Sequence, residues 1–188
     1  MADLPHGREL CIGATRVSRR EWRRYHGRVR HSGVSPAKRL LFVCTGNICR
    51  SPLAEAIFRH QVEQVGRAAD FELDSAGTHG YHEGERADAR ARAVGAARGV
   101  AVTSIAREVR DSDFKRFDLI LAMDRGHLSE LRGRCPVPLR DKIRLMREFG
   151  EPTGGDVPDP YYSDDGAFEE VFDILDACCR GLLAELTR

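Results

Sequence analysis

The sequence predicts a small single-domain α/β fold, with a parallel sheet of about four strands, helices on both faces, and an anion-binding loop at the end of the first strand. Residues 39–43 (RLLFV) and 117–123 (FDLILAM) contain the continuous apolar stretches LLFV and LILAM, as strands buried on both faces do. Segments of helical character follow both runs, and strands that alternate with helices form parallel sheets covered on two sides. The chain length of 188 residues fits one such domain.

The first 38 residues differ in composition from the rest. They hold nine basic residues against three acidic ones, although the whole chain has a net charge of only +1. The turn-rich residues 32–36 (SGVSP) mark a border, so we expect an N-terminal extension at 1–38 and a folded domain at 39–188. Low apolar content predicts a disordered, solvated extension. Less favoured alternatives are that the extension binds nucleic acid or an anionic membrane surface, or that it is a transit peptide.

The domain opens with a strand, a loop and a helix. After the strand at 39–43, Pro52 stands where the first turn of a helix needs no N–H group. Apolar residues then recur at helical spacing until Gly66 ends the run. They are Ala54, Ile57, Phe58, Val62 and Val65.

The alternation continues to the C-terminus. In order, we expect a strand at 71–77, a helix at 87–100, the strand at 117–123, a short helix at 124–134, a weaker strand at 142–146, a loop at 150–166 and a helix from 167 onward. In parallel sheets of this kind, ligands bind at the carboxyl ends of the strands. The loop after residue 43 lies at such an end.

The overall composition is that of an ordinary globular protein. Hydrophobic residues make up 41% and charged residues 31% of the chain. We find neither an apolar stretch long enough for a membrane span nor a signal-peptide core. The six cysteines do not form a disulfide framework, so we expect a reducing, cytoplasmic setting.

The loop sequence CTGNICRS, residues 44–51, carries the chemistry. Backbone N–H groups and the helix dipole at this junction favour an anion and would stabilise a thiolate at Cys44. Gly46 permits a tight turn, and Asn47 tolerates left-handed backbone angles. Arg50 presents a planar fork that matches two phosphate oxygens, and Ser51 can donate to the thiolate. Cysteine, five residues and arginine therefore predict a nucleophile facing a phosphate loop.

Other uses of the cysteine pair fit less well. A zinc site prefers a shorter spacing than Cys44-x4-Cys49 and a second ligand pair, and His79 and His82 are more typical of solvent-facing loop residues. The Cys-x-x-Cys spacing of thioredoxin-type proteins is absent from the sequence. We therefore expect no metal and no cofactor.

The sequence resembles the low-molecular-weight protein-tyrosine phosphatases. The matching stretches are LFVCTGNICRSPLAEAIF, DSAGTHGYHEGERADARA, FDLILAMD and the segment around DPYY, and they span residues 39–186. The resemblance implies that Cys44 forms a phosphocysteine, that Arg50 binds the phosphate, and that Asp159 is the general acid and base. The same loop also offers Asp156, Asp164 and Asp165, and residue types alone do not distinguish these carboxylates from Asp159.

Further roles follow from the resemblance. Substrate binding is implied for seven residues besides Ser51: Gly46, Asn47, Ile48, Cys49, Tyr81, Tyr161 and Tyr162. Ser75 is expected to support the loop, and Cys49 to form a reversible disulfide with Cys44 under oxidation. Asp124 is expected to lie behind the site or to cap a helix. The 1–38 extension has no counterpart, and the 79–88 segment varies within the family, so substrate preference stays open.

The sequence thus predicts a cofactor-free enzyme that hydrolyses phosphotyrosine monoesters. The expected partners are phosphotyrosine proteins, among them autophosphorylating tyrosine kinases. Thioredoxin-coupled arsenate reductase is the alternative, since it reuses the Cys-x5-Arg loop with extra cysteines on a mobile segment. The candidates for that relay are Cys11, Cys135, Cys178 and Cys179. A non-catalytic phosphate-binding module is a third, less favoured interpretation.

Overall fold

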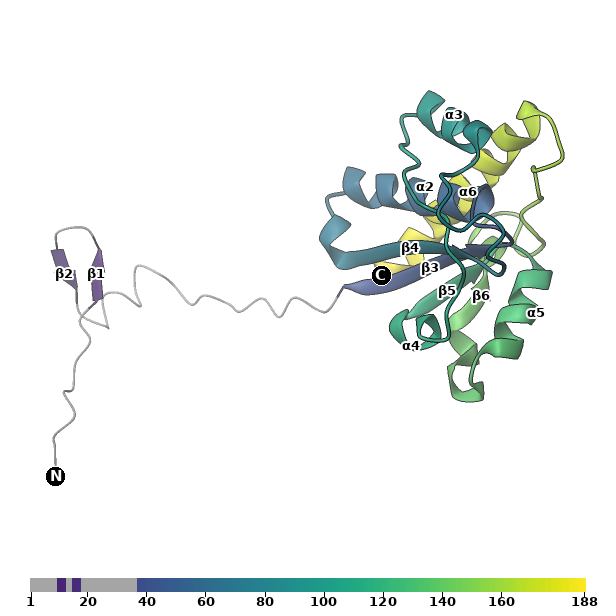
Figure 1. The fold of residues 1–188 in the computed structure, drawn as a ribbon. Helices are drawn as coiled ribbons and strands as arrows, with labels where there is room; N and C mark the ends of the chain where they lie inside the picture. The colour runs from purple at the N-terminus through teal and green to yellow at the C-terminus, as the bar shows by residue number, and fades with distance from the viewer. Residues whose placement is uncertain (1–9, 13–14, 18–36) are drawn as a thin grey trace. The chain divides into compact units, whose positions relative to one another are not determined.

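The computed structural model describes residues 10–12, 15–17 and 37–188 (Figure 1). Strands β1 (Leu10–Ile12) and β2 (Thr15–Val17) pair antiparallel with each other. The expectation of a disordered extension otherwise concerns residues that lie outside the described part. The predicted boundary between residues 38 and 39 stays a prediction.

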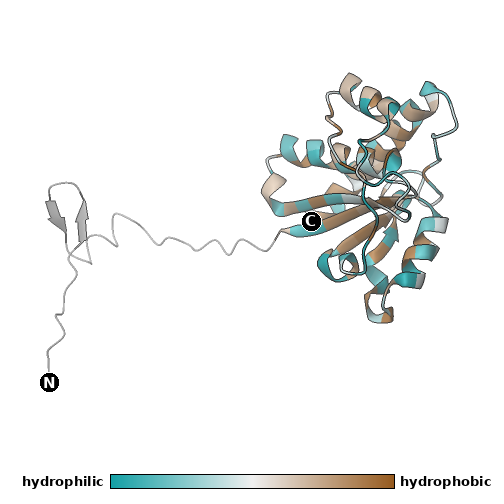
Figure 2. Cartoon of the chain, in the orientation of Figure 1, coloured by the Kyte–Doolittle hydropathy of each residue, from teal (hydrophilic) through white to brown (hydrophobic). Residues whose placement is uncertain are grey.

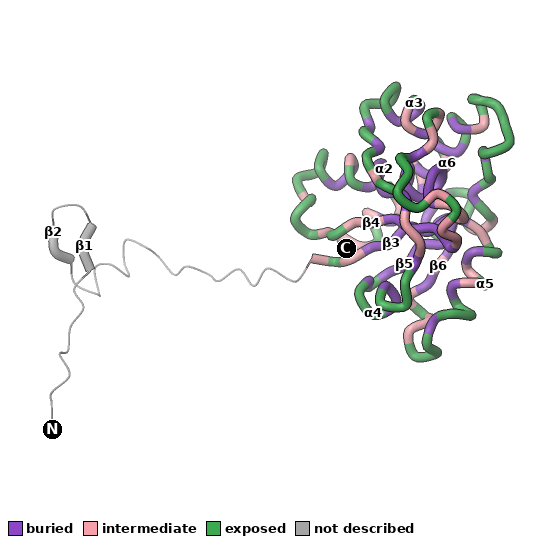
Figure 3. The backbone as a smooth tube through the Cα atoms, in the orientation of Figure 1, coloured by how far each residue is buried: buried purple, intermediate pink, exposed green. Residues whose placement is uncertain are grey.

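Four parallel strands form the sheet of the main unit, as predicted. They are β3 (Lys38–Cys44), β4 (Phe71–Gly77), β5 (Leu119–Ala122) and β6 (Ile143–Leu145). Their order is β4-β3-β5-β6, so β3 lies in the middle of the sheet next to β4 and β5. Figures 2 and 3 show β3 and β5 as largely hydrophobic and buried, which explains their continuous apolar runs.

Helices cover both faces of this sheet. Three helices pack on one face: α2 (Arg50–Gln64), α3 (Ala89–Ala97) and α6 (Asp165–Leu186). The other face is covered by α4 (Asp113–Arg116) and α5 (Arg125–Arg134). Alternate residues of β3 enter the two cores, Leu40 and Phe42 on the α2 side and Leu41 and Val43 on the α5 side. None of the helices in the described part of the chain is both long and apolar enough to cross a bilayer.

The predicted elements occur in the expected order, with shifts at several ends. The strand at 71–77 is confirmed to the residue. Helix α3 is shorter than expected because the Asp88 carboxylate accepts from the Arg90 N–H and starts the helix there, while Gly99 beyond its end has a φ of 75°. Helix α6 begins two residues early, since Asp164 caps it by accepting from the Ala167 N–H.

Several short elements were not predicted. They are α4 and the 3-10 turns η1 (Ala68–Asp70), η2 (Val137–Lys142) and η3 (Met146–Phe149). A single turn has too few residues to show a periodic apolar pattern. These turns connect the predicted elements without changing the topology.

Candidate active site

The loop between β3 and α2 brings Cys44 and Ser51 together. Cys44 is the last residue of β3, and Ser51 lies in the first turn of α2. The Cys44 Sγ and the Ser51 Oγ are 3.0 Å apart, and both side chains are buried. The Ser51 hydroxyl also lies 3.3 Å from the Ala76 carbonyl, so its one proton can serve either the sulfur or that carbonyl.

Asn47 gives the loop its shape. It is the one described residue other than glycine with a positive φ, at 57°. Its side chain donates to the Ser51 Oγ at 2.9 Å and accepts from the Arg107 N–H at 3.0 Å. Arg107 could not be predicted from the sequence, because this contact uses only its backbone N–H.

Gly46 leaves room for a neighbouring side chain. The left-handed backbone angles of this loop are found at Asn47, where they were expected, and not at Gly46. A Cβ at Gly46 would lie 2.9 Å from the His82 Cδ2, so the missing side chain makes room for the His82 ring beside the loop.

The end of β4 supports the loop from the side. The N–H groups of Thr78 and His79 donate to the carbonyls of Cys44 and Thr45 at 2.8 and 3.0 Å. A Cβ at Gly77 would lie 2.6 Å from the Thr45 carbonyl oxygen, so only glycine fits this close backbone contact.

Ser75 contacts the helix that follows the loop. Its hydroxyl donates to the Glu55 carboxylate at 2.7 Å, a buried group on α2 that also accepts from Ser104 at 2.7 Å. The structure therefore places Ser75 against the helix that follows the loop.

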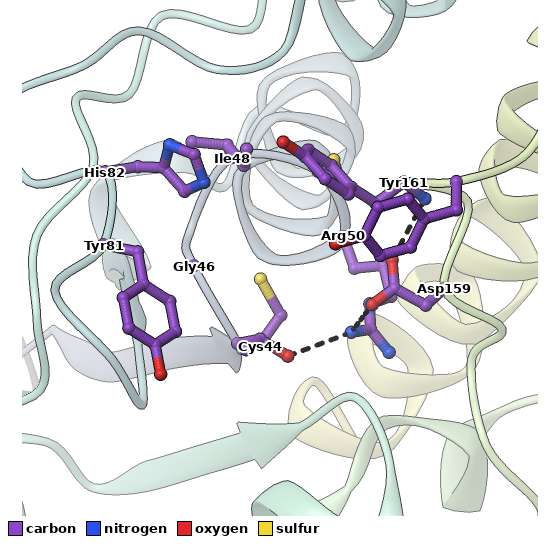
Figure 4. A pocket seen from close by; sticks show the side chains of 11 residues that line it. Cys44, Gly46, Ile48, Arg50, Tyr81, His82, Asp159 and Tyr161 are labelled. Carbon is purple, nitrogen blue, oxygen red and sulfur yellow. Dashed lines mark hydrogen bonds and ion pairs between the residues drawn. The ribbon is translucent and has the colours of Figure 1, made fainter.

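Arg50 lies at the centre of the site (Figure 4). Its NH1 donates to the Asp124 carboxylate at 3.0 Å and to the Val157 carbonyl at 3.2 Å. Its NH2 donates to the Thr45 hydroxyl at 3.3 Å and to the Asp159 carboxylate at 2.7 Å. The buried Arg50 Nε has no hydrogen-bond partner within the described residues. A buried donor of this kind is what an anion in the loop would satisfy.

Asp124 holds Arg50 from behind and also caps α5, as expected. Its carboxylate accepts from the His127 N–H at 2.8 Å, and the His127 Nδ1 lies 2.9 Å away. Burial alone would raise the pKa of Asp124, but the hydrogen bonds from His127 and the charge of Arg50 hold it well below the usual range. The His127 Nε2 lies 2.8 Å from the Thr45 hydroxyl, so His127 braces the loop as well. Sequence reasoning missed both Thr45 and His127.

Asp159 reaches the site from the loop before α6. The Arg50 guanidinium is 4% exposed and the Asp159 carboxylate 50% exposed, so their ion pair joins the floor of the site to its mouth. The other Asp159 oxygen accepts from the Tyr161 N–H at 3.2 Å.

The other carboxylates of this loop are engaged elsewhere. Asp156 accepts from the N–H and the guanidinium of Arg125 at the start of α5. Asp164 caps α6, and Asp165 lies in its first turn. Of these four aspartates, Asp159 is the one that lines the cavity in front of Cys44.

The residues around Cys44 enclose a cavity of about 280 Å³. Nine of the predicted site residues line it: Cys44, Gly46, Ile48, Cys49, Arg50, Tyr81, Asp159, Tyr161 and Tyr162. Two further lining residues, Thr45 and His82, were not predicted. In Figure 4 the Cys44 sulfur points into the space between Tyr81 and the Asp159–Tyr161 side. Asn47, Ser51 and Ser75 do not line the cavity; they lie beneath it.

Aromatic rings form the rim. Tyr81 is 72% exposed and stacks on the His79 ring at 5.0 Å between centroids. Tyr161 meets Tyr162 edge-on at 4.8 Å, and the His82 ring lies 6.3 Å from Tyr161. The cavity therefore has aromatic walls above a charged floor.

The remaining cysteines differ from Cys44 in their surroundings. Burial, with the nearby Asp88 carboxylate, raises the pKa of Cys49 to about 12. Cys178 and Cys179 lie on α6 and are packed in the core, and Cys135 is the buried residue that ends α5, with its thiol facing the Pro136 carbonyl. All three are therefore buried in regular structure, which does not match the relay on a mobile segment that an arsenate reductase would need. The Cys11 side chain lies outside the described part.

The histidines of the 79–88 segment contact neighbouring side chains. His79 lies 2.9 Å from the Thr78 hydroxyl, and the His82 Nδ1 lies 2.9 Å from a Glu85 oxygen. Within the described residues, no group of three or more metal-binding side chains is gathered at one point.

Known proteins share this arrangement. The family model for low molecular weight phosphotyrosine protein phosphatases matches residues 39–188. A low molecular weight protein-tyrosine-phosphatase of Streptomyces coelicolor is 50% identical over 151 residues, which cover 78% of this chain and 92% of that protein. A human low molecular weight phosphotyrosine protein phosphatase is 37% identical over 148 residues, covering 78% and 94%. A solved protein tyrosine phosphatase from Entamoeba histolytica, with Hepes in its active site, superposes with a TM-score of 0.78 at 46% identity, covering 80% of this chain and 97% of that one.

Proposed function

The chain belongs to the low molecular weight phosphotyrosine protein phosphatase family, and on that premise we propose that Cys44, Arg50 and Asp159 carry its reaction. The enzyme is a phosphoric monoester hydrolase that cleaves phosphotyrosine through a phosphocysteine intermediate. One observation supports the assignment above all. The Arg50–Asp159 contact of 2.7 Å, across 109 positions of sequence, brings a carboxylate to the cavity that Cys44 faces.

In the first step the substrate phosphate occupies the loop. The backbone N–H groups of the loop and the Arg50 guanidinium hold its oxygens, with the buried Nε supplying a donor. The Cys44 thiolate attacks phosphorus in line with the phenol oxygen. Protonated Asp159 gives its proton to that oxygen as the P–O bond breaks.

In the second step water hydrolyses the phosphocysteine. Asp159, now ionised, accepts a proton from the water that attacks phosphorus. The Cys44 thiolate leaves, and the Ser51 hydroxyl at 3.0 Å stabilises it. Both steps use only side chains, backbone N–H groups and water.

The roles of the remaining predicted residues follow from where they lie. Tyr81 and Tyr161 form the walls that hold the substrate ring, while Ile48 lines the cavity beside them. A tyrosine ring spans the distance from rim to floor, whereas phosphoserine is shorter, which supports selectivity for phosphotyrosine. Asn47 and Ser75 maintain the shape of the loop through Ser51 and Glu55.

We test the acid assignment by leaving-group dependence. Asp159→Asn should lower kcat/KM by roughly 10²- to 10⁴-fold for phenyl phosphate, and much less for 2,4-dinitrophenyl phosphate, whose leaving group needs no proton. Asp156→Asn is the matched control, because its carboxylate contacts Arg125 away from the cavity. If the control shows the leaving-group dependence and Asp159→Asn does not, the assignment is wrong.

We also propose that residues 39–188 suffice for catalysis and that the 1–38 extension is dispensable. The family match over residues 39–188 supports this. A shortened chain that starts at Lys38 should retain the kcat/KM of the full chain. Loss of turnover by a folded shortened chain would contradict it.

Phosphotyrosine proteins are the substrates, and we propose autophosphorylating tyrosine kinases among them, in the cytoplasm. A reactive thiol at Cys44 works best in reducing surroundings, which supports that setting. An Asp159→Ala variant should retain bound phosphoproteins, and mass spectrometry of the retained proteins would identify them. A retained set without any tyrosine kinase would refute the kinase proposal.

A further inference from the structure

Arg90, near the start of α3, contacts the loop that carries Asp159. Its NH1 donates to the Ser163 carbonyl and its NH2 to the Tyr161 carbonyl, each at 3.0 Å. Its guanidinium also lies 4.5 Å above the centre of the Phe168 ring on α6. One side chain thus holds the backbone on the C-terminal side of Asp159 at two points.

Asp88 ties Arg90 to the phosphate loop. Its two carboxylate oxygens accept from the Arg90 Nε at 3.1 Å and NH2 at 3.0 Å, a two-point ion pair. The Asp88 N–H donates to the Ile48 carbonyl at 2.8 Å. A continuous series of hydrogen bonds therefore runs from the loop around Cys44, through Asp88 and Arg90, to the loop of Asp159.

This series is independent of the Arg50–Asp159 contact. When phosphate occupies the loop, the Arg50 guanidinium is shared with its oxygens, and Asp159 must face the leaving oxygen instead. The Arg90 contacts are with backbone carbonyls and Arg90 does not line the cavity, so substrate binding leaves them in place. From this arrangement we propose that Arg90 is a positioning residue, which holds Asp159 at the height of the leaving oxygen above Cys44. The inference rests on the acid role proposed for Asp159.

The expected effect is specific to proton transfer. Arg90→Ala should lower kcat/KM for phenyl phosphate by about tenfold to a hundredfold, since a displacement of about 1 Å costs that much. For 2,4-dinitrophenyl phosphate the change should stay within about threefold, because its leaving group departs unprotonated. The inhibition constant of inorganic phosphate should not change. Arg90→Lys should resemble Arg90→Ala, as one ammonium group cannot serve Asp88 and two carbonyls in a fixed plane.

Arg98, the C-cap residue at the other end of α3, provides the matched control. It pairs with Asp173 at 2.9 Å and lies 5.0 Å above the Phe172 ring, so Arg98→Ala removes the same kinds of contact away from the site. We expect the kcat/KM of Arg98→Ala to stay within about threefold of the parent value for both substrates.

A double variant completes the test. In the Asp159→Asn background, Arg90→Ala should cause no further loss, because the group that it positions is gone. Three results would each overturn the role of Arg90. They are an Arg90→Ala variant whose kcat/KM falls equally for both substrates, weaker inhibition of that variant by phosphate, or a full additional loss of kcat/KM in the Asp159→Asn background. If Asp159→Asn alone shows no leaving-group dependence, the acid assignment fails, and this inference fails with it.

Discussion

Replacing Arg50 by lysine keeps the positive charge and removes the planar fork. The guanidinium contacts Asp124, Val157, Thr45 and Asp159 at once, and its Nε remains for the phosphate. A single ammonium nitrogen cannot keep this set and also bind two phosphate oxygens. The variant should therefore lose about two charge-assisted hydrogen bonds in the transition state.

The size of the loss follows from that count. Each bond to a charged group contributes roughly 1.5–3 kcal/mol, so the barrier rises by about 3–6 kcal/mol. This corresponds to a fall of roughly 10²- to 10⁴-fold in kcat/KM. The fall should exceed the weakening of inorganic phosphate binding, because negative charge on the phosphoryl oxygens is best matched in the transition state.

Steady-state kinetics with p-nitrophenyl phosphate and inhibition by inorganic phosphate measure the two quantities. Arg39→Lys is the control, since Arg39 forms a comparable two-point pair with Asp118 at the far end of β3. Circular dichroism shows whether each variant is folded at the assay temperature. If a folded Arg50→Lys enzyme has a kcat/KM within about tenfold of the parent, the reasoning is refuted, because a positive charge alone would then suffice.

Three further predictions concern the same region. Peroxide should oxidise Cys44 to a sulfenic acid, which inactivates the enzyme, and the Cys49 sulfur should then displace water to form a reversible Cys44–Cys49 disulfide. Disulfide closure should be faster at higher pH, because the pKa of Cys49 is raised to about 12 and its thiolate fraction grows with pH; mass spectrometry that shows only sulfonic acid at Cys44 would contradict this. Gly77→Ala should lower kcat/KM by about tenfold or more and should also lower the unfolding temperature, since the new Cβ would lie only 2.6 Å from the Thr45 carbonyl oxygen. Unchanged turnover would show that the loop can shift to accept the methyl group without loss of activity. The pKa of Asp124 is lowered in the folded state, so the ionised carboxylate stabilises the fold at pH values above the unfolded pKa of 3.8. Below pH 3.8 this contribution to the free energy of unfolding falls by roughly 1.4 kcal/mol per pH unit. The Asp124→Asn variant should lack this loss, and an acid-unfolding profile identical to that of the parent would count against the prediction.

The sequence predicted the strands and the phosphate loop well because their signals are local. A continuous apolar run shows burial on both faces, as in β3, and Cys44 and Arg50 lie six positions apart in one loop. Helix ends were less accurate where a side chain decides them, as Asp88 and Asp164 do by capping.

Residue type could not distinguish the proposed acid, Asp159, from its neighbours. It is one of four aspartates in residues 150–166, and only the fold shows that Asp159 meets Arg50 while Asp156 contacts Arg125. His127 and Arg90 were not predicted for the same reason, since their contacts are far away in sequence, at Thr45 and at Tyr161. Nothing near them in the chain distinguishes them from surface residues.

The most direct test of the account is to find the phosphoryl group on its nucleophile. In the Asp159→Asn variant a good leaving group still departs, while the base for hydrolysis is lost, so the intermediate should accumulate. The variant is mixed with 2,4-dinitrophenyl phosphate, quenched within milliseconds, digested and sequenced by mass spectrometry. We predict one phosphoryl group on the peptide that contains Cys44, on the sulfur, and none when Cys44 is also changed to serine. A phosphoryl group on another side chain, or a burst of phenol release that survives the Cys44→Ser change, would contradict the central claim.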